Sequence, residues 1–317
     1  MSVSVALGLA LVPGCAPMRS GPAAAARPHL GANAYTSFDG SVFPYRKWLP
    51  AAEPRLVVIG FHGIAGASSD LDNLGRDLRS RRPATAVYAP DLRGQGYDPI
   101  VSRRGDIRDP GHWFHDARTF SHLVRRRHPD ARLVWFGESM GALIALHAMA
   151  AVSPGDPPAE ALILSSPVVR LRGLPPSMFD FLRIAAAIAP GSRTSLEALT
   201  GVDQVQLTRD TIHEEQVLKN PYHISEFTLR FYRTLVELVE GMPGQAERIR
   251  TPVLILHGGR DLFSHPADVA SFASRFHSAS GVQRAYLPES HHLLFYDHQR
   301  EQALDTVSNW LRGLTSK

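Results

Sequence analysis

Cysteine is almost absent from this sequence of 317 residues, because Cys15 is the only one. A single thiol excludes an intramolecular disulfide, so the fold must be held together by its apolar core alone. Apolar residues make up 44% of the chain, which is enough for a large core. Beyond the first 30 residues, no apolar run is long enough to cross a bilayer, so we expect no transmembrane span there.

The signs of several ligand classes are also missing. The net charge is only +4 and no basic stripe is interleaved with aromatic residues, so a nucleic-acid partner is not expected. The 15 histidines include no H-E-x-x-H motif, and the adjacent His291 and His292 would point to opposite sides of an extended chain, which argues against a metal site. No G-x-G-x-x-G follows a predicted strand, which argues against a dinucleotide site. We therefore predict a protein that needs no cofactor.

The most informative pattern present is Gly-Glu-Ser-Met-Gly at residues 137–141. It directly follows the apolar run 133–136 and precedes a helical pattern at 142–150. A G-x-S-x-G at a strand-to-helix junction is typical of a nucleophile elbow, in which Ser139 sits on a strained turn and the flanking glycines let strand and helix pass closely. The alternative, a glycine-rich turn with a solvated serine, is not excluded by the pentapeptide alone.

Two later segments supply an acid and a base in the order that such an elbow requires. A buried-type strand at 251–256 runs into a Gly-Gly turn that ends at Asp261, and a short strand at 285–288 precedes Glu-Ser-His-His. Ligand crevices form at the carboxyl ends of parallel strands, where both segments would lie. We therefore predict a catalytic triad of Ser139, Asp261 and His292, with the imidazole as base and the carboxylate fixing its tautomer.

His291 competes with His292 for the role of base. His292 is favoured because two leucines follow it directly and would anchor it to the core, which leaves His291 as a solvated loop residue. Asp297 and His298, a few residues later, are predicted to be surface positions.

An oxyanion hole needs two converging backbone N–H donors. One is predicted to be Met140, which follows the nucleophile. The other is predicted to be Ile64, because Gly63 lets the chain turn sharply after the strand at 56–61. His62 is expected to orient this loop through hydrogen bonds rather than to take part in the chemistry.

Taken together, these segments resemble the monoglyceride lipase and lysophospholipase branch of the α/β-hydrolase superfamily, a set also described as serine aminopeptidase-like. The resemblance spans roughly residues 34–315 and rests on an opening hairpin (38–50), an oxyanion loop (61–63), the elbow (137–141), a Leu-Ser-Ser-Pro strand end (164–167), an acid turn (257–261) and a closing histidine segment (292–294). It implies an α/β-hydrolase fold and a monoacyl lipid, such as a monoacylglycerol or a lysophospholipid, as substrate.

The chain departs from this family in one segment. The family often shows D-x-R-G-H-G-x-S after its fourth strand, whereas residues 91–98 have Gln95 in place of the histidine and Asp98 in place of the serine. The departure does not touch the predicted triad, but the acyl-chain preference of the family is not carried over.

Six strand-like runs alternate with helical patterns along the chain. The strands are predicted at residues 57–61, 86–89, 133–136, 161–164, 253–256 and 283–287, and helices at 70–79, 113–127 and 265–276. This alternation predicts an α/β fold with a mostly parallel central sheet flanked by helices, in one domain of residues 31–317.

The interval of about residues 168–250 interrupts this alternation. It shows helical spacing at 177–189, 195–199, 212–219 and 225–240, and a structureless loop of such length is implausible in a compact domain. We therefore predict an inserted helical cap over Ser139. The apolar stripe within 178–188 is expected either to pack the core of the cap or to form part of an acyl pocket.

Residues 1–30 are predicted to form a leader. An apolar run at 3–12 leads to Gly14-Cys15, which resembles a bacterial lipoprotein signal in which Cys15 becomes lipidated, and residues 16 to about 30 would form a flexible tether. We expect a lipoprotein or an exported protein of the bacterial cell envelope, which could associate with a membrane through the lipid. Because no Lys or Arg precedes the apolar run, a cytoplasmic protein with a disordered leader is the alternative.

The sequence thus predicts a serine hydrolase that cleaves carboxylic esters through an acyl-enzyme. Two alternatives are kept. An aminopeptidase or amidase would need a cap carboxylate to bind the substrate amine, for which Glu214, Glu215 and Glu226 are available. A non-catalytic envelope protein that binds a ligand would have no use for a complete triad.

Overall fold

The computed structural model describes residues 27–153, 155–171, 176–200, 224–277 and 281–315. Within these residues, nine strands form one sheet in the order β1-β2-β3-β5-β4-β6-β7-β10-β11. The strands are β1 (His29–Leu30), β2 (Ala34–Thr36), β3 (Val42–Trp48), β4 (Leu56–Phe61), β5 (Thr85–Pro90), β6 (Arg132–Glu138), β7 (Ala161–Ser165), β10 (Val253–Gly258) and β11 (Val282–Leu287). The six strands from β5 to β11 in this order are parallel, and β1, β2 and β3 join antiparallel at one edge.

The central strands form where apolar residues run without interruption. Every residue of β4, β5, β7 and β10 is buried, as expected for parallel strands that are covered on both faces. Each of the six predicted strands is present and differs from its predicted range by at most two residues at either end. The predicted fold class is therefore confirmed.

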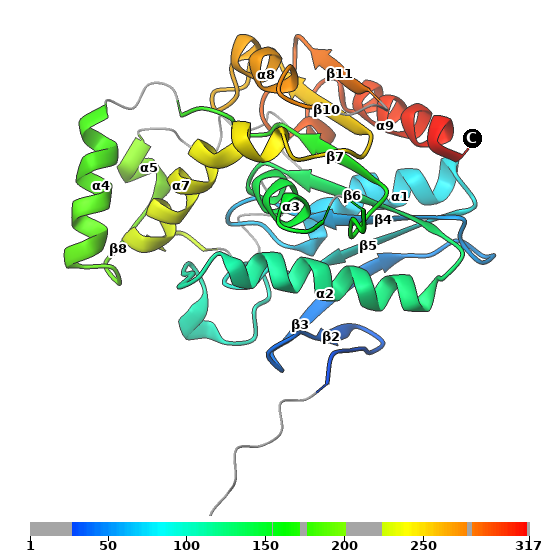
Figure 1. The fold of residues 1–317 in the computed structure, drawn as a ribbon, viewed down its shortest axis with the longest axis horizontal. Helices are drawn as coiled ribbons and strands as arrows, with labels where there is room; N and C mark the ends of the chain where they lie inside the picture. The colour runs from blue at the N-terminus through cyan, green and yellow to red at the C-terminus, as the bar shows by residue number, and fades with distance from the viewer. Residues whose placement is uncertain (1–26, 154, 172–175, 201–223, 278–280, 316–317) are drawn as a thin grey trace, which may run out of the picture.

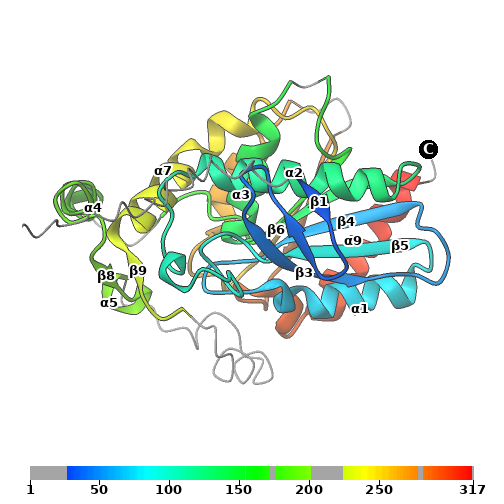
Figure 2. The same ribbon diagram turned by 90° about the horizontal axis from the view of Figure 1, so that it is seen from below.

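Helices cover the two faces of the sheet, as Figures 1 and 2 show. One face carries α2 (Gly111–Arg127), α3 (Met140–Ala150), α7 (Leu229–Ala246) and α8 (Pro266–Ala273), and the other carries α1 (Asp72–Arg81) and α9 (Arg300–Thr315). Each face has its own apolar core, and α3, which lies against β6 at the centre, is buried along its whole length. The elbow that precedes α3 is therefore fixed on a rigid support.

The amino-terminal edge begins earlier than the predicted domain boundary. His29 and Leu30 already pair with Thr36 and Tyr35, within the segment that the sequence predicts as a tether. Residues 1–26, including Cys15, lie outside the described residues.

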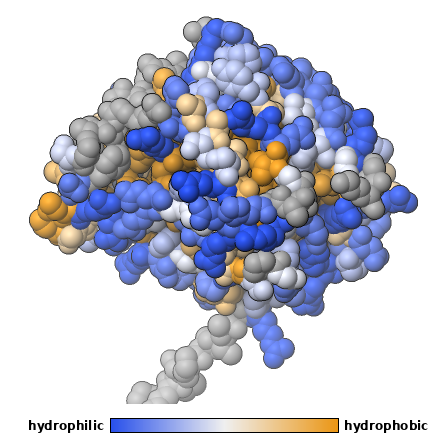
Figure 3. All heavy atoms as spheres, turned by 45° about the horizontal axis from the view of Figure 1, so that its top comes forward, coloured by the Kyte–Doolittle hydropathy of each residue, from blue (hydrophilic) through white to orange (hydrophobic). Residues whose placement is uncertain are grey.

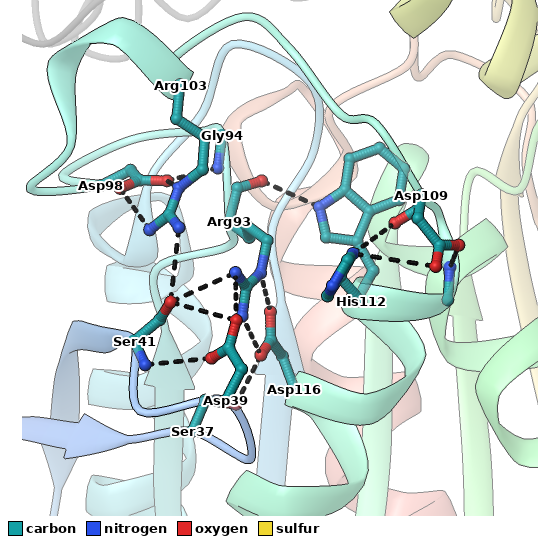
Figure 4. Close-up of polar contacts among 12 residues, drawn as sticks. Ser37, Asp39, Ser41, Arg93, Gly94, Asp98, Arg103, Asp109, His112 and Asp116 are labelled. Atoms are coloured by element: carbon teal, nitrogen blue, oxygen red, sulfur yellow. Dashed lines mark hydrogen bonds and ion pairs between the residues drawn. The ribbon is translucent and has the colours of Figure 1, made fainter. Parts of the chain in front are cut away.

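A buried arginine ties this edge to α2. Arg93, 5% exposed, donates to both carboxylate oxygens of Asp116 (2.7 and 2.8 Å) and pairs with Asp39 at 2.8 Å. Figure 4 shows the guanidinium between the turn of the β2–β3 hairpin and α2. Its charge also lies 5.0 Å from the ring centroid of Phe43. Burial alone would raise the pKa of Asp39, but the hydrogen bonds from Arg93 and Ser41 and the charge of Arg93 together outweigh it and lower that pKa to about 2.

Between β7 and β10 the described chain contains α4 (Pro176–Ile188), β8 (Arg193–Thr194), α5 (Leu196–Thr200), β9 (Phe227–Thr228) and α7. α4 and α5 lie at one end of the molecule, away from the central sheet (Figure 1). The predicted helix at 212–219 lies outside the described residues.

The apolar stripe of α4 is divided between two environments. Leu182 and Ala186 are buried, whereas Phe181, Ile184 and Ile188 are 58, 61 and 80% exposed. In Figure 3, apolar residues gather at the left edge of the molecule, on the side where Figure 1 places α4. Among the described residues, no helix combines the length and the apolar character that a membrane span requires.

Candidate active site

The chain passes from β6 to α3 through a strained turn at Ser139. Its φ and ψ are 52° and −117°, a backbone conformation that non-glycine residues adopt at a cost. A Cβ at Gly141 would lie 2.0 Å from the carbonyl oxygen of Phe61, and one at Gly137 would lie 2.4 Å from that of Gly141. Glycine is required at both positions because strand and helix approach too closely for any side chain.

Three side chains from distant segments meet at this turn. The Ser139 hydroxyl lies 2.8 Å from Nε2 of His292, and Nδ1 of His292 lies 2.9 and 3.0 Å from the two carboxylate oxygens of Asp261. Asp261 follows β10 and His292 follows β11, so both project from the carboxyl ends of neighbouring parallel strands. All three residues are less than 10% exposed. The structure thus brings together the three residues that the sequence selects.

The surroundings of His292 favour its charged form. Burial lowers the pKa of the imidazole, but the charge of Asp261, its hydrogen bond and the nearby Glu138 raise it, and the net pKa lies above the ordinary value. Asp261 accepts further hydrogen bonds from the backbone N–H groups of Phe263 (2.8 Å) and Ser264 (3.2 Å).

Glu138 is a second acidic group close to Ser139. Burial, reinforced by the nearby Asp70, raises the pKa of Glu138 to about 8, while His292 opposes this shift. The carboxyl group of Glu138 therefore keeps its proton to a higher pH than an exposed glutamate would, and where it is ionised its charge favours the imidazolium of His292.

The loop after β4 packs directly on the elbow. A Cβ at Gly63 would lie 3.6 Å from that of Ser139, so this turn brings the loop that carries Ile64 next to Ser139. Both ring nitrogens of His62 are engaged: Nδ1–H donates to the carbonyl of Gly63 (2.9 Å) and Nε2 accepts from the N–H of Leu92 (3.1 Å). Burial lowers the pKa of His62 to about 4, so the ring is neutral. Its hydrogen bonds orient the loop, as predicted.

The two departures from the family pattern each have a local explanation. The side-chain oxygen of Gln95 accepts a hydrogen bond from the N–H of Ala65 at 3.0 Å, so Gln95 supports the loop next to Ile64. Asp98 is fully buried and accepts two hydrogen bonds from Arg103 at 2.7 and 2.9 Å (Figure 4). The charge that Asp98 introduces is thus balanced by an arginine five residues later.

One sequence prediction at the site is wrong. Asp297 is not a surface residue, because its side chain is fully buried. It accepts hydrogen bonds from the backbone N–H and from Nδ1 (2.9 Å) of His291, and from the N–H of His298 at 2.7 Å. His291 is therefore only partly exposed and paired rather than freely solvated. His291 and His298 thus fold around the carboxylate of Asp297, and the spacing of these residues in the sequence does not predict this arrangement.

Two serines contact the site but were not identified from the sequence. The Ser166 hydroxyl donates to the carbonyl oxygen of His292 at 2.6 Å, and the Ser264 hydroxyl donates to that of Pro167 at 2.5 Å. The Leu-Ser-Ser-Pro segment is the only signal for Ser166 in the sequence, and it indicates the end of a strand without indicating a hydrogen-bond partner.

Two other kinds of site, a metal site and a carboxylate that would bind a substrate amine, have little support in the described part of the chain. Its residues include no group of three His, Cys, Asp or Glu side chains arranged to hold a metal. Of the three cap carboxylates considered for recognition of an amine, Glu214 and Glu215 lie outside the described residues and Glu226 is exposed.

Comparisons with known proteins agree with this architecture. Residues 52–299 match the model of the family described as serine aminopeptidase, S33. The monoacylglycerol lipase of Mycolicibacterium smegmatis is 26% identical over 281 residues, which cover 88% of this chain and 96% of the relative.

Two solved structures are similar in fold. A soluble variant of the monoglyceride lipase of Saccharomyces cerevisiae, in complex with a substrate analogue, has a TM-score of 0.73 and 18% identity, with 91% of this chain and 98% of that chain covered. A thermostable carboxyl esterase of Bacillus coagulans, in complex with glycerol, has a TM-score of 0.74 and 21% identity, with 88 and 97% covered. The family match spans well over half of the sequence, so the chain belongs to the serine aminopeptidase S33 family.

Proposed function

We propose that this protein is a serine hydrolase that cleaves carboxylic esters through an acyl-enzyme. The observation that carries the proposal is the unbroken line from the Ser139 hydroxyl through the His292 imidazole to the Asp261 carboxylate, at a strained elbow. A serine hydroxyl becomes a useful nucleophile only when a neighbouring base removes its proton, and this geometry provides that base.

In the proposed reaction, Oγ of Ser139 attacks the ester carbonyl while its proton moves to Nε2 of His292. The backbone N–H groups of Met140 and Ile64 are assigned to the resulting oxyanion. His292 then gives the proton to the leaving alcohol, and the acyl group stays on Ser139. A water molecule, deprotonated by the same imidazole, attacks the acyl-enzyme and releases the carboxylic acid, which restores the serine.

The substrate class that we propose is a monoacyl lipid, such as a monoacylglycerol or a lysophospholipid. Similarity to two monoacylglycerol lipases supports this choice. The exposed apolar residues of α4 also support it, because an enzyme that collects its substrate from a lipid phase gains from apolar surface that can contact that phase. We interpret residues 168–250 as a cap over Ser139.

The test is labelling with a fluorophosphonate probe, followed by assays on p-nitrophenyl esters of increasing acyl length, on a monoacylglycerol and on a lysophospholipid. We expect labelling and ester turnover, with aminoacyl p-nitroanilides left uncleaved. Cleavage of the anilides in preference to the esters would favour the amidase alternative, and failure of the folded protein to react with the probe would overturn the proposal.

The pH dependence of this activity follows from the raised pKa of His292. The base must be neutral to accept the serine proton, so kcat/KM should fall tenfold per pH unit as the pH drops through that pKa. Because Asp261 stabilises the imidazolium, the midpoint should lie above the ordinary value of about 6.5. A pH profile measured with a short-chain p-nitrophenyl ester checks this, and a midpoint below 6 would contradict the proposed pairing.

We further propose that Cys15 is lipidated and anchors the enzyme to the cell envelope through residues 16–26. A metabolic label on the full chain that is lost in Cys15→Ser would support this proposal. An unlabelled wild-type chain in the cytosol would favour the alternative of a disordered leader.

A further inference from the structure

The end of β7 contributes no member of the triad, yet it has an unusual backbone. Ser166 is one of three non-glycine residues in the described chain with a positive φ, at 44°. It is fully buried, and its N–H donates to the carbonyl of Leu256 in β10 at 2.8 Å. A strained residue persists only where its surroundings hold it, and such residues often serve a function.

This backbone conformation accompanies a hydrogen bond from the Ser166 hydroxyl to His292. The hydroxyl donates to the carbonyl oxygen of His292 at 2.6 Å, across 126 residues of sequence. The main chain of the proposed base is therefore attached to the end of β7 as well as to its own strand β11.

The next residue makes the corresponding contact with the acid loop. The carbonyl oxygen of Pro167 accepts a hydrogen bond from the hydroxyl of the fully buried Ser264 at 2.5 Å. The N–H of Ser264 donates in turn to the carboxylate of Asp261, at 3.2 Å. These bonds close a ring that runs from His292 through Ser166, Pro167 and Ser264 to Asp261 and back to the imidazole.

We propose that Ser166 and Ser264 are positioning residues that together set the alignment of His292 with Asp261. This inference rests on the proposed function, because it assigns the role of base to His292. The two loops that carry the acid and the base follow different strands, and the turn after β7 is bonded to both of them. The two loops are also joined directly, where the N–H of Arg260 donates to the carbonyl oxygen of Ser290 at 2.9 Å. The bridge through the turn after β7 adds a second connection, which acts at His292 itself and at Ser264.

The consequence for catalysis depends on which groups face the imidazole. Asp261 reaches Nδ1 from the β10 loop, the Ser139 hydroxyl reaches Nε2 from the elbow, and Glu138 acts on it from the end of β6. On its own segment, His291 is already paired with Asp297. Asp261 is thus the main group that raises the pKa of the imidazole, and a looser contact with it should lower that pKa.

The experiment compares four single variants of the full chain. Ser166→Ala and Ser264→Ala each remove one bond of the bridge. Ser166→Gly also removes the hydroxyl but tolerates the positive φ, so it separates loss of the bond from a failure to fold. Ser165→Ala is the matched control, because the neighbouring Ser165 hydroxyl is buried and has no hydrogen-bond partner among the described residues.

We expect both Ser166 variants and Ser264→Ala to lower kcat for a p-nitrophenyl ester by about 10- to 100-fold, because small misplacements of a catalytic group have effects of this size. KM should change by less than about threefold, and the acidic limb of the pH profile should move to lower pH. Ser165→Ala should behave as the wild type. In the double variant Ser166→Ala/Ser264→Ala, the losses should not multiply, because either single change already opens the ring.

A second readout does not depend on turnover. The proton on Nδ1 of His292, which is hydrogen-bonded to Asp261, should give a downfield NMR resonance that weakens or shifts in the Ser166 and Ser264 variants and not in Ser165→Ala. An unchanged resonance together with kcat within threefold of wild type, or a rise in KM alone, would overturn the inference. A wild-type protein without esterase activity would refute the proposed function, and the resonance would still decide whether the bridge aligns the pair.

Discussion

Replacing Ser139 with Ala is expected to lower kcat for ester hydrolysis by about 10⁴- to 10⁶-fold. The size of the effect follows from covalent catalysis: without Oγ no acyl-enzyme forms, and His292 has no proton to remove from the nucleophile. The activity that remains would come from the oxyanion donors and from substrate binding alone. Because only one buried oxygen is lost and the turn keeps its flanking glycines, the free energy of unfolding should change little.

The measurement is a rate assay with active-site titration, so that traces of wild-type enzyme are not counted as residual turnover. Fluorophosphonate labelling of the same samples is the independent control, and it should be abolished in the variant. Turnover within tenfold of the wild type would mean that Ser139 is not the nucleophile, and the search would move to the other serines of the site.

Replacing Arg93 with Met is expected to lower the free energy of unfolding by about 3–5 kcal/mol. Met keeps much of the volume but removes the charge that pairs with Asp116, whose side chain is 4% exposed. The Asp116 carboxylate would then be left with the hydroxyl of Ser37 and no cation, at the point where α2 meets the edge hairpin. Most of this destabilisation comes from leaving the Asp116 carboxylate buried without a partner, and less of it comes from losing the attraction between Arg93 and Asp116.

Urea denaturation of Arg93→Met beside the wild type gives this number. Arg76→Met is the matched control, because the side chain of Arg76 is 74% exposed and pairs with Asp72 on the same helix at 2.9 Å, a type of pair that contributes less than about 1 kcal/mol. The double variant Arg93→Met/Asp116→Leu should recover part of the loss, since no charge stays buried. A single variant as stable as Arg76→Met would show that solvent reaches Asp116.

Much of this fold can be predicted from the sequence because its central elements are specified locally. Uninterrupted apolar runs are found in strands that are buried on both faces, and glycines 137 and 141 mark a close contact that no other residue allows. The position of a polar residue at the end of such a strand then predicts its place at the crevice, which is why Ser139, Asp261 and His292 can be selected without a structure.

The residues that support the site are harder to predict from the sequence. Whether Asp297 is buried depends on how residues 290–298 fold around it, and the partners of Ser166 and Ser264 lie 126 and 97 residues away. A serine near the end of a strand has the same local pattern whether its hydroxyl faces water or another loop. Likewise, helical spacing identifies α4 but does not show that Phe181, Ile184 and Ile188 in its apolar stripe are largely exposed.

The order of the triad along the chain has a consequence for biosynthesis. The elbow with Ser139 is translated first, then Asp261, and His292 follows Ser139 by 153 residues. Because domains are made from the amino terminus at about 5–20 residues per second, the nucleophile exists for many seconds as an ordinary hydroxyl without its base. Under the proposed mechanism, a nascent or truncated chain that stops before the segment after β11 cannot attack esters, so hydrolysis begins only when that segment has been made.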